Sequence, residues 1–356
     1  MTDLITKGFH HVTMVSGNAQ RTVKFYRDLL GLGLVKRTVN FDDPTAYHLY
    51  FGQERGAPGT LLTFFEWAGL PHGRPGIGGV HHVALGVADE AALLKWKRWL
   101  NDHHVPTTGP VNRGYFKSLY FQDPDGQILE LATKGPGYAI DEPAGALGQQ
   151  VMTPNDAQLQ RSPEGRLYAE MTHAEPVASI GADMAIDGIH HISAITADTE
   201  RADRFYSSAL GLRRIKKSVN QDALNMPHHF WANYDGKTVG PHSGWTLFGY
   251  PENWNRVRGG VGQTHHVAFR APDAESQAAW REALVAAGVG VSPVMERTYF
   301  KSIYFQDPDG LLLEIATDDP GFAVDEDPSR LGESLALPAW LEGEREQIER
   351  SLVPIV

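Results

Sequence analysis

The sequence predicts an α+β protein of four βαβββ modules, arranged as two tandem domains. The first observation behind this prediction is a repeated stretch: residues 115–133 (YFKSLYFQDPDGQILELAT) and 299–317 (YFKSIYFQDPDGLLLEIAT) are nearly identical and lie 184 positions apart. The second is a set of four His-His pairs, at residues 10–11, 81–82, 190–191 and 265–266. The first and third pairs lie 180 positions apart, and the second and fourth 184. Constant offsets indicate duplicated units.

The first module is expected to contain a strand, a helix and three further strands. Residues 21–34 carry apolar side chains at helical spacing, and Gly31 stands where a helix C-cap is expected. The strands are expected in runs rich in aromatic and β-branched residues, at residues 9–15, 34–41, 46–52 and 59–67. The third module repeats the pattern, with a helix in residues 200–212 that ends at Gly211.

The second and fourth modules have helices expected at residues 92–100 and 276–288. Their last two strands are joined by Asp-Pro-Asp-Gly, at residues 123–126 and 307–310. Proline sets φ for a turn and glycine supplies the left-handed position, so these tetrapeptides predict hairpin turns with a structural role.

The modules predict the domain boundaries. A segment of about 47 residues rich in Gly, Pro and Ala separates the second and third modules, and a loop of that length in a compact fold is expected to be a linker or an arm around a partner domain. We expect a first domain at residues 1–140 (modules 8–66 and 79–134), the linker or arm at 141–187, a second domain at 188–325 (modules 188–250 and 263–318), and a tail with a short helix at 326–356.

Composition excludes several classes of function. The chain of 356 residues has 42% hydrophobic residues, and its N-terminal sequence does not resemble a signal peptide, which predicts a cytoplasmic protein with no membrane partner. A formal charge of −11 argues against nucleic acid as a partner. Cysteine is absent, which excludes disulfides and thiolate metal ligands. The sequence leaves a homo-oligomer open.

The repeated stretch contains a candidate metal ligand. Glu130 and Glu314 each lie inside an apolar strand, where an ionised carboxylate needs a cation or several hydrogen-bond donors. A pair with Arg113 or Arg297 is the alternative. Neighbouring residues of a strand face opposite sides, so one histidine of each His-His pair is expected to bind directly. Two histidines and a carboxylate match the triad of non-haem Fe(II) oxygenases, although Zn, Mn, Ni or Co bind the same ligands.

The HHV, DPDG and LE motifs of the modules resemble the vicinal oxygen chelate superfamily, which includes glyoxalases, bleomycin resistance proteins and extradiol dioxygenases. Four segments are more closely similar to ring-cleaving dioxygenases that open hydroquinone-type rings: TVNFDDPTAYHLYFG, ERTYFKSIYFQDPDG, LLLEIATDDPGF and LALPAWLE, at residues 38–52, 296–310, 311–322 and 335–342. The resemblance implies mixed, curved sheets that form metal-binding bays.

The resemblance also implies roles for individual residues. It implies iron on His11, His266 and Glu314, with Thr13 among the residues that contact the substrate. The residues expected to move protons or stabilise an anion are His10, His265, Arg297 and Tyr304. Aromatic residues on sister strands of modules one and three, including Tyr47 and Trp231, are candidates to line a flat substrate pocket, with packing in the core as the alternative.

The duplication predicts a second set of ligands. If module one pairs with module four, modules two and three bring together His82, His191 and Glu130, with Arg113, Tyr120 and Ser193 around them. If modules pair within a domain, the groups are instead His11, His82, Glu130 and His191, His266, Glu314. The sequence leaves both groupings open.

The predicted function is an Fe(II)-dependent dioxygenase that cleaves a hydroquinone- or catechol-type ring with O2. The alternatives are a glyoxalase-like isomerase or lyase and a small-molecule binding protein of the same superfamily. A glyoxalase-like enzyme is expected to supply a further carboxylate from the last strand of the partner module, where Thr63 and Thr246 stand. Glu66, three residues beyond Thr63, keeps the glyoxalase-like alternative open.

Overall fold

The computed structural model describes residues 4–53, 55–159 and 171–356. Outside these ranges lie part of the predicted linker and four other residues. The described residues belong to two compact units. Unit 1 has the bounds Met1–Pro75, Pro124–Gly126 and Val257–Val356, and unit 2 has the bounds Gly76–Asp123 and Gln127–Arg256.

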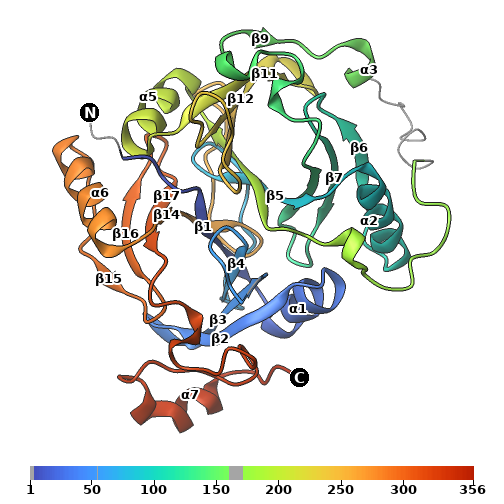
Figure 1. The fold of residues 1–356 in the computed structure, drawn as a ribbon. Helices are drawn as coiled ribbons and strands as arrows, with labels where there is room; N and C mark the ends of the chain where they lie inside the picture. Colours follow the sequence, from blue (N-terminus) through green and yellow to red (C-terminus); the bar gives the residue numbers. More distant parts are fainter. Residues whose placement is uncertain (1–3, 54, 160–170) are drawn as a thin grey trace. The chain divides into compact units, whose positions relative to one another are not determined.

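Unit 1 contains an eight-stranded sheet in the order β15-β16-β17-β14-β1-β4-β3-β2. Its two central strands, β1 and β14, are antiparallel, and β4 and β17 run parallel to them on either side. Figure 1 shows the blue strand β1 beside the orange strands of module four. The strands are β1 Phe9–Ser16, β2 Gly33–Asn40, β3 Asp43–Gly52, β4 Leu61–Glu66, β14 Thr264–Ala271, β15 Met295–Glu296, β16 Lys301–Gln306 and β17 Leu312–Thr317.

Unit 2 repeats this arrangement in a nine-stranded sheet, in the order β6-β7-β8-β5-β10-β13-β12-β11-β9. The antiparallel pair at its centre is β5 and β10, and β9 from the predicted linker adds to the edge strand β11. The strands are β5 Val80–Val87, β6 Thr108–Asn112, β7 Lys117–Gln122, β8 Ile128–Thr133, β9 Val151–Met152, β10 Ile189–Thr196, β11 Arg213–Asn220, β12 Ala223–Ala232 and β13 Gly244–Gly249.

One helical segment per module packs against the sheet, and each begins at an Asn or Asp whose side chain accepts a backbone N–H of the first turn. Gly31 and Gly211 have φ of 72° and 65°, the left-handed conformation of a helix C-terminus. The four segments are α1 Ala19–Val23 continued by η1 Lys24–Leu29, α2 Glu90–Asp102, α5 Thr199–Leu210 and α6 Ala274–Ala286. Shorter helices are η2 Tyr138–Ile140, η3 Ala144–Ala146, α3 Asp156–Leu159, η4 Ala182–Met184, η5 Phe322–Val324, η6 Glu342–Glu344 and, in the predicted tail, α7 Arg345–Ser351.

The compact units do not coincide with the domain boundaries predicted from the sequence. The predicted domains, 1–140 and 188–325, follow the order of the duplication, whereas each unit combines one module from either half of the chain. Within each unit the first strands pair, β1 with β14 and β5 with β10, which satisfies the backbone N–H and C=O groups at their edges. Every module offers the same edge, so a prediction that followed the order of the chain could not choose between the partners.

Two arms, the similar segments at residues 137–148 after module two and 321–332 after module four, are each attached to the sheet of their unit by a buried lysine. In unit 1 the Lys36 ammonium, fully buried, donates to Asp325 at 2.6 Å and to Glu326. In unit 2 the equally buried Lys216 ammonium donates to Asp141 and, at 2.6 Å, to Glu142. The Asp-Glu pair is common to the similar segments GYAIDEPAGALG and GFAVDEDPSRLG. The arm after module four therefore binds module one, and the arm after module two binds module three.

Within the described ranges, every helix is too short or too polar to cross a membrane.

Candidate metal centre

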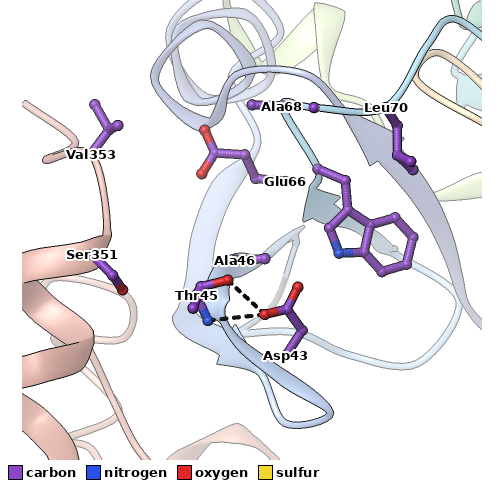
Figure 2. A pocket seen from close by; sticks show the side chains of 10 residues that line it. Asp43, Thr45, Ala46, Glu66, Ala68, Leu70, Ser351 and Val353 are labelled. Atoms are coloured by element: carbon purple, nitrogen blue, oxygen red, sulfur yellow. Dashed lines mark hydrogen bonds between the residues drawn. The ribbon is translucent and has the colours of Figure 1, made fainter.

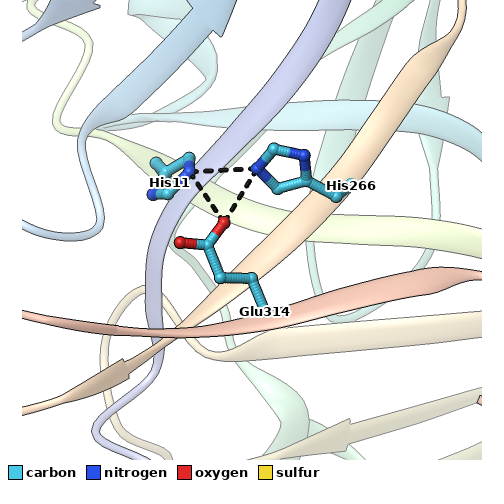
Figure 3. Close-up of side chains that lie close together, drawn as sticks. All are labelled: His11, His266 and Glu314. Carbon is cyan, nitrogen blue, oxygen red and sulfur yellow. Dashed lines mark hydrogen bonds and ion pairs between the residues drawn. The ribbon is translucent and has the colours of Figure 1, made fainter. Parts of the chain in front are cut away.

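Three buried side chains from three strands of unit 1 converge on one point. His11 extends from β1, His266 from β14 and Glu314 from β17 (Figure 3). The two Nε2 atoms lie 3.3 Å apart. Glu314 Oε2 lies 2.8 Å from His266 Nε2 and 3.4 Å from His11 Nε2. This group joins module one to module four.

Unit 2 contains a matching group from modules two and three. His82 Nε2 and His191 Nε2 lie 3.3 Å apart, and Glu130 Oε2 lies 2.8 Å from the first and 3.2 Å from the second. In both units the ligand atoms lie within 4.8 Å of one another. Of the two groupings that the sequence left open, the structure therefore forms the one across the two halves of the chain.

The charge and hydrogen bonding of the group in unit 1 fit a bound cation. Burial would raise the pKa of Glu314, but His11 and His266 outweigh it and hold this pKa well below its usual range. Burial lowers the pKa of His266, which favours its neutral form. Among the described residues Glu314 Oε2 has no hydrogen-bond partner of suitable geometry. An ionised, fully buried carboxylate beside imidazole nitrogens is a ligand set for a divalent transition metal.

The first histidine of each pair orients the second. His10 Nδ1 lies 2.9 Å from His11 Nδ1, and His265 Nδ1 lies 2.7 Å from His266 Nδ1. Burial and the adjacent histidine lower the pKa of His10 to about 3 and that of His265 to about 4, so both rings are neutral. A neutral ring can accept the Nδ1–H of its neighbour, which leaves the neighbour's Nε2 lone pair directed at the centre.

A small cavity adjoins the three side chains of unit 1. Its polar lining includes Arg297, whose guanidinium donates to Asp42 at 3.1 Å and lies 5.6 Å from the centre of the Tyr304 ring. Burial raises the pKa of Tyr304, so its phenol is protonated. The cavity is lined by His11, Asn40, Phe41, Asp42, His48, Tyr50, Phe65, His266, Arg297, Phe300 and Tyr304. The lining presents aromatic side chains together with a guanidinium cation, which suits an ionised phenol.

A chain of hydrogen bonds runs from the centre into β3. Thr13 Oγ1 lies 2.9 Å from His266 Nε2 and 2.8 Å from Thr63 Oγ1. Thr63 in turn lies 3.1 Å from His48 Nε2, and the Tyr50 hydroxyl lies 2.9 Å from His48 Nδ1. Burial lowers the pKa of His48 well below its usual value, so this imidazole is neutral. The sequence interpretation missed His48, although the offset of 180 maps it onto His228 in the sister strand.

Two predicted substrate contacts lie elsewhere. Tyr47 and Trp231 do not line this cavity, and their prediction is corrected. Tyr47 precedes His48 in β3, and adjacent residues of a strand face opposite sides of the sheet. Trp231 lies in unit 2, where its indole N–H donates to Asp203 of α5. The remaining predicted residues lie at or beside the group: Thr13, His10, His265, Arg297 and Tyr304.

Glu66, which kept a fourth carboxylate ligand open, points away from the cavity. It faces a separate hollow of unit 1, lined also by Asp43, Trp67 and Val353 (Figure 2). Its Oε1 accepts the backbone N–H of Ala19 at the start of α1, at 2.8 Å. Thr63 stands at the position where a glyoxalase-like enzyme was expected to supply its carboxylate, and its hydroxyl lies within hydrogen-bond distance of Thr13 and His48.

The family follows from comparison with known proteins. The model of the Glyoxalase/Bleomycin resistance protein/Dioxygenase superfamily matches residues 8–131 and 188–315. The chain belongs to this superfamily. The match confirms the predicted fold class, because the two matched stretches correspond to the two halves of the duplication.

Proteins named as dioxygenases resemble this chain over nearly its whole length. "Putative ring-cleaving dioxygenase MhqO" of Bacillus subtilis is 35% identical over 98% of this chain and 96% of its own. "Chlorohydroquinone/hydroquinone 1,2-dioxygenase" of Sphingobium indicum is 30% identical over 97% and 96%. A crystal structure described as a putative dioxygenase from Bacillus subtilis superposes with a TM-score of 0.79 at 32% identity, covering 99% of this chain and 98% of its own. Glyoxalase I from Zea mays, at a TM-score of 0.57 and 18% identity over 87% and 92%, shares the fold.

Proposed function

We propose that this protein is an Fe(II)-dependent dioxygenase that opens hydroquinone- or catechol-type rings with O2. The observation that supports this most strongly is the combination of an open three-ligand group, His11, His266 and Glu314, with an aromatic cavity beside it. The full-length likeness to proteins named as ring-cleaving dioxygenases supports the reaction class. Two histidines and one carboxylate leave coordination positions open for a substrate oxygen and O2.

In this proposal a ferrous ion held by His11, His266 and Glu314 would let electrons pass from the aromatic substrate to O2 with no net change in its own oxidation state, and the chain's other residues supply positioning and charge. Phe65 and Phe300 line the cavity and offer aromatic surfaces to the ring. The Arg297 guanidinium stabilises the negative charge of an ionised phenol. The protonated Tyr304 hydroxyl and the neutral His48 imidazole are placed to donate or accept a proton while the ring carbon–carbon bond breaks and both oxygen atoms are incorporated.

Isomerisation of a thiol adduct, as in glyoxalases, is the competing function. It requires a fourth protein ligand from β4. The two candidates there, Thr63 and Glu66, both have other partners. Thr63 is engaged with Thr13 and His48, and Glu66 is engaged with the N-terminus of α1. A binding protein that only sequesters small molecules does not need two sets of buried ligands.

The test is O2 uptake by the protein after anaerobic loading with Fe(II), with a panel of hydroquinones and catechols. We expect uptake with hydroquinones first, and its loss in His11→Ala and Glu314→Ala, each checked by circular dichroism for an intact fold. Tyr47→Phe, on the opposite side of β3, is the matched control and should keep its activity. Absence of O2 uptake with the whole panel, together with turnover of a hemithioacetal, would overturn the proposal in favour of the isomerase.

A further inference from the structure

The ligand atoms of the group in unit 2 make fewer hydrogen bonds to other side chains than those of the group in unit 1. In unit 1 the Ser302 hydroxyl donates to Glu314 Oε1, and Thr13 binds His266 Nε2. In unit 2, within the described residues, both oxygens of Glu130 and the hydroxyl of Ser118, which corresponds to Ser302, lack a hydrogen-bond partner of suitable geometry. Glu130 Oε2 lies 2.8 Å from His82 Nε2 and 3.2 Å from His191 Nε2, close enough for all three atoms to bind one ion.

A buried carboxylate in this state is costly without a cation. Glu130 is completely buried, and His82 and His191 are 1% exposed. Moving an ionised carboxylate out of water is unfavourable even after the protein relaxes around it. His81 and His190 each place Nδ1 2.8 Å from the Nδ1 of their neighbour, which directs both Nε2 lone pairs inward as in unit 1. Every feature that fits a metal in unit 1 is thus repeated.

The two groups differ in how they are covered. Arg297 in unit 1 pairs with the exposed Asp42, whereas its counterpart Arg113 is only 8% exposed and donates to the Tyr120 hydroxyl at 3.2 Å. Phe41, which lines the cavity of unit 1, is replaced in unit 2 by Gln221. The Gln221 amide donates to the backbone carbonyl of Asn112, next to Arg113, at 2.8 Å. This bond joins module three to module two beside the guanidinium.

We propose that unit 2 binds a second divalent transition-metal ion through His82, His191 and Glu130, and that the cover formed by Arg113 and Gln221 makes this ion exchange more slowly than the ion of unit 1. The chain then carries two metal ions. The proposal does not depend on the reaction proposed for unit 1, because it concerns binding alone.

Metal stoichiometry tests the proposal. Protein stripped of metal, reloaded with Co(II) and passed through a desalting column should contain two ions per chain by elemental analysis. Glu130→Gln should contain one, its matched control Glu314→Gln one, and the double variant none. A wild-type ratio of one that Glu130→Gln leaves unchanged and Glu314→Gln abolishes would overturn the proposal. If Glu130→Gln does not fold, the wild type and Glu314→Gln decide alone. The proposal predicts two ions per chain in the wild type and one in Glu314→Gln, whereas a single site in unit 1 predicts one and none.

Release of the metal tests the cover. With excess chelator, Co(II) should leave the wild type in two phases, the slower at least 10-fold behind the faster. Glu314→Gln should retain only the slow phase and Glu130→Gln only the fast one. Gln221→Ala, which removes the bond to Asn112, should accelerate the slow phase alone. Equal release rates from the two single variants would refute the slow exchange assigned to unit 2.

Discussion

The doubled histidines lead to a prediction about metal affinity. In His10→Phe the aromatic ring is kept, so that packing on Phe300, at 5.0 Å between ring centres, is preserved. The contact at 2.9 Å between His10 Nδ1 and His11 Nδ1 is lost. Removal of a partner that orients a metal-bound histidine weakens metal binding by about 10- to 100-fold. That range corresponds to about 1.4 to 2.7 kcal/mol, which exceeds the roughly 1 kcal/mol net value of one ordinary hydrogen bond because the ligand also loses its fixed orientation.

The assay is a titration of the metal-free protein with Fe(II) under anaerobic conditions, followed by O2 uptake at a fixed hydroquinone concentration. The half-activating Fe(II) concentration should rise about 10- to 100-fold in His10→Phe, while the rate at saturating Fe(II) changes less. His190→Phe makes the same change beside His191 in unit 2 and should leave this titration unaltered. An unchanged half-activating concentration in His10→Phe would refute the role given to the first histidine of each pair.

Three further predictions concern the cavity, the arms and the metal. Tyr304→Phe should lower kcat by roughly 10²-fold at unchanged metal content, because the phenol lines the cavity but is not a ligand; equal rates for Tyr304→Phe and wild type would contradict this. Lys36→Met should destabilise unit 1 by about 3 kcal/mol in chemical denaturation, because Asp325 and Glu326 lose their buried counter-ion, and Lys216→Met should act likewise on unit 2. An unchanged denaturation midpoint in Lys36→Met would count against this role of the buried lysine. Removal of metal by a chelator should abolish O2 uptake and Fe(II) should restore it; activity that survives a metal content near zero would exclude the proposed chemistry.

Much of the fold could be predicted because the sequence repeats itself. Each motif appears at a constant offset, so a weak local pattern in one module is supported by its sister: Gly31 and Gly211 both end helices with positive φ, and Gly126 and Gly310 both occupy left-handed turn positions. The six candidate ligands followed from the repetition together with the family resemblance, whereas their grouping into two sets did not. A strand glutamate 48 positions after a His-His pair keeps its place relative to β5 and β14 in both copies.

The packing partners and the faces of the strands could not be predicted in this way. Period-two alternation says that Tyr47 and His48 face opposite sides, but which side borders the cavity depends on the register of β3 on β4, where His48 lies opposite Phe65. Likewise each module presents the same free edge, so local sequence cannot tell whether β1 pairs with β5 or with β14. The buried lysines are the signal that could have decided it, because their acidic partners lie in the arm that follows the module to be paired.

The residues that differ between the two units bear on function, as do the residues that the units share. Tyr50 gives His48 Nδ1 a hydroxyl, whereas the corresponding Phe230 leaves His228 Nδ1 without a hydrogen-bond partner among the described residues. Gln221 stands for Phe41 and bonds to the backbone of the adjoining module. The ligands and most of the cavity lining are retained in both units, and the lining residues that differ are Phe41 and Tyr50, which are Gln221 and Phe230 in unit 2. Ligand retention fits metal binding in both units, and the two differences support the proposal of ring chemistry in unit 1, where the aromatic cavity and the hydrogen bond between Tyr50 and His48 occur together.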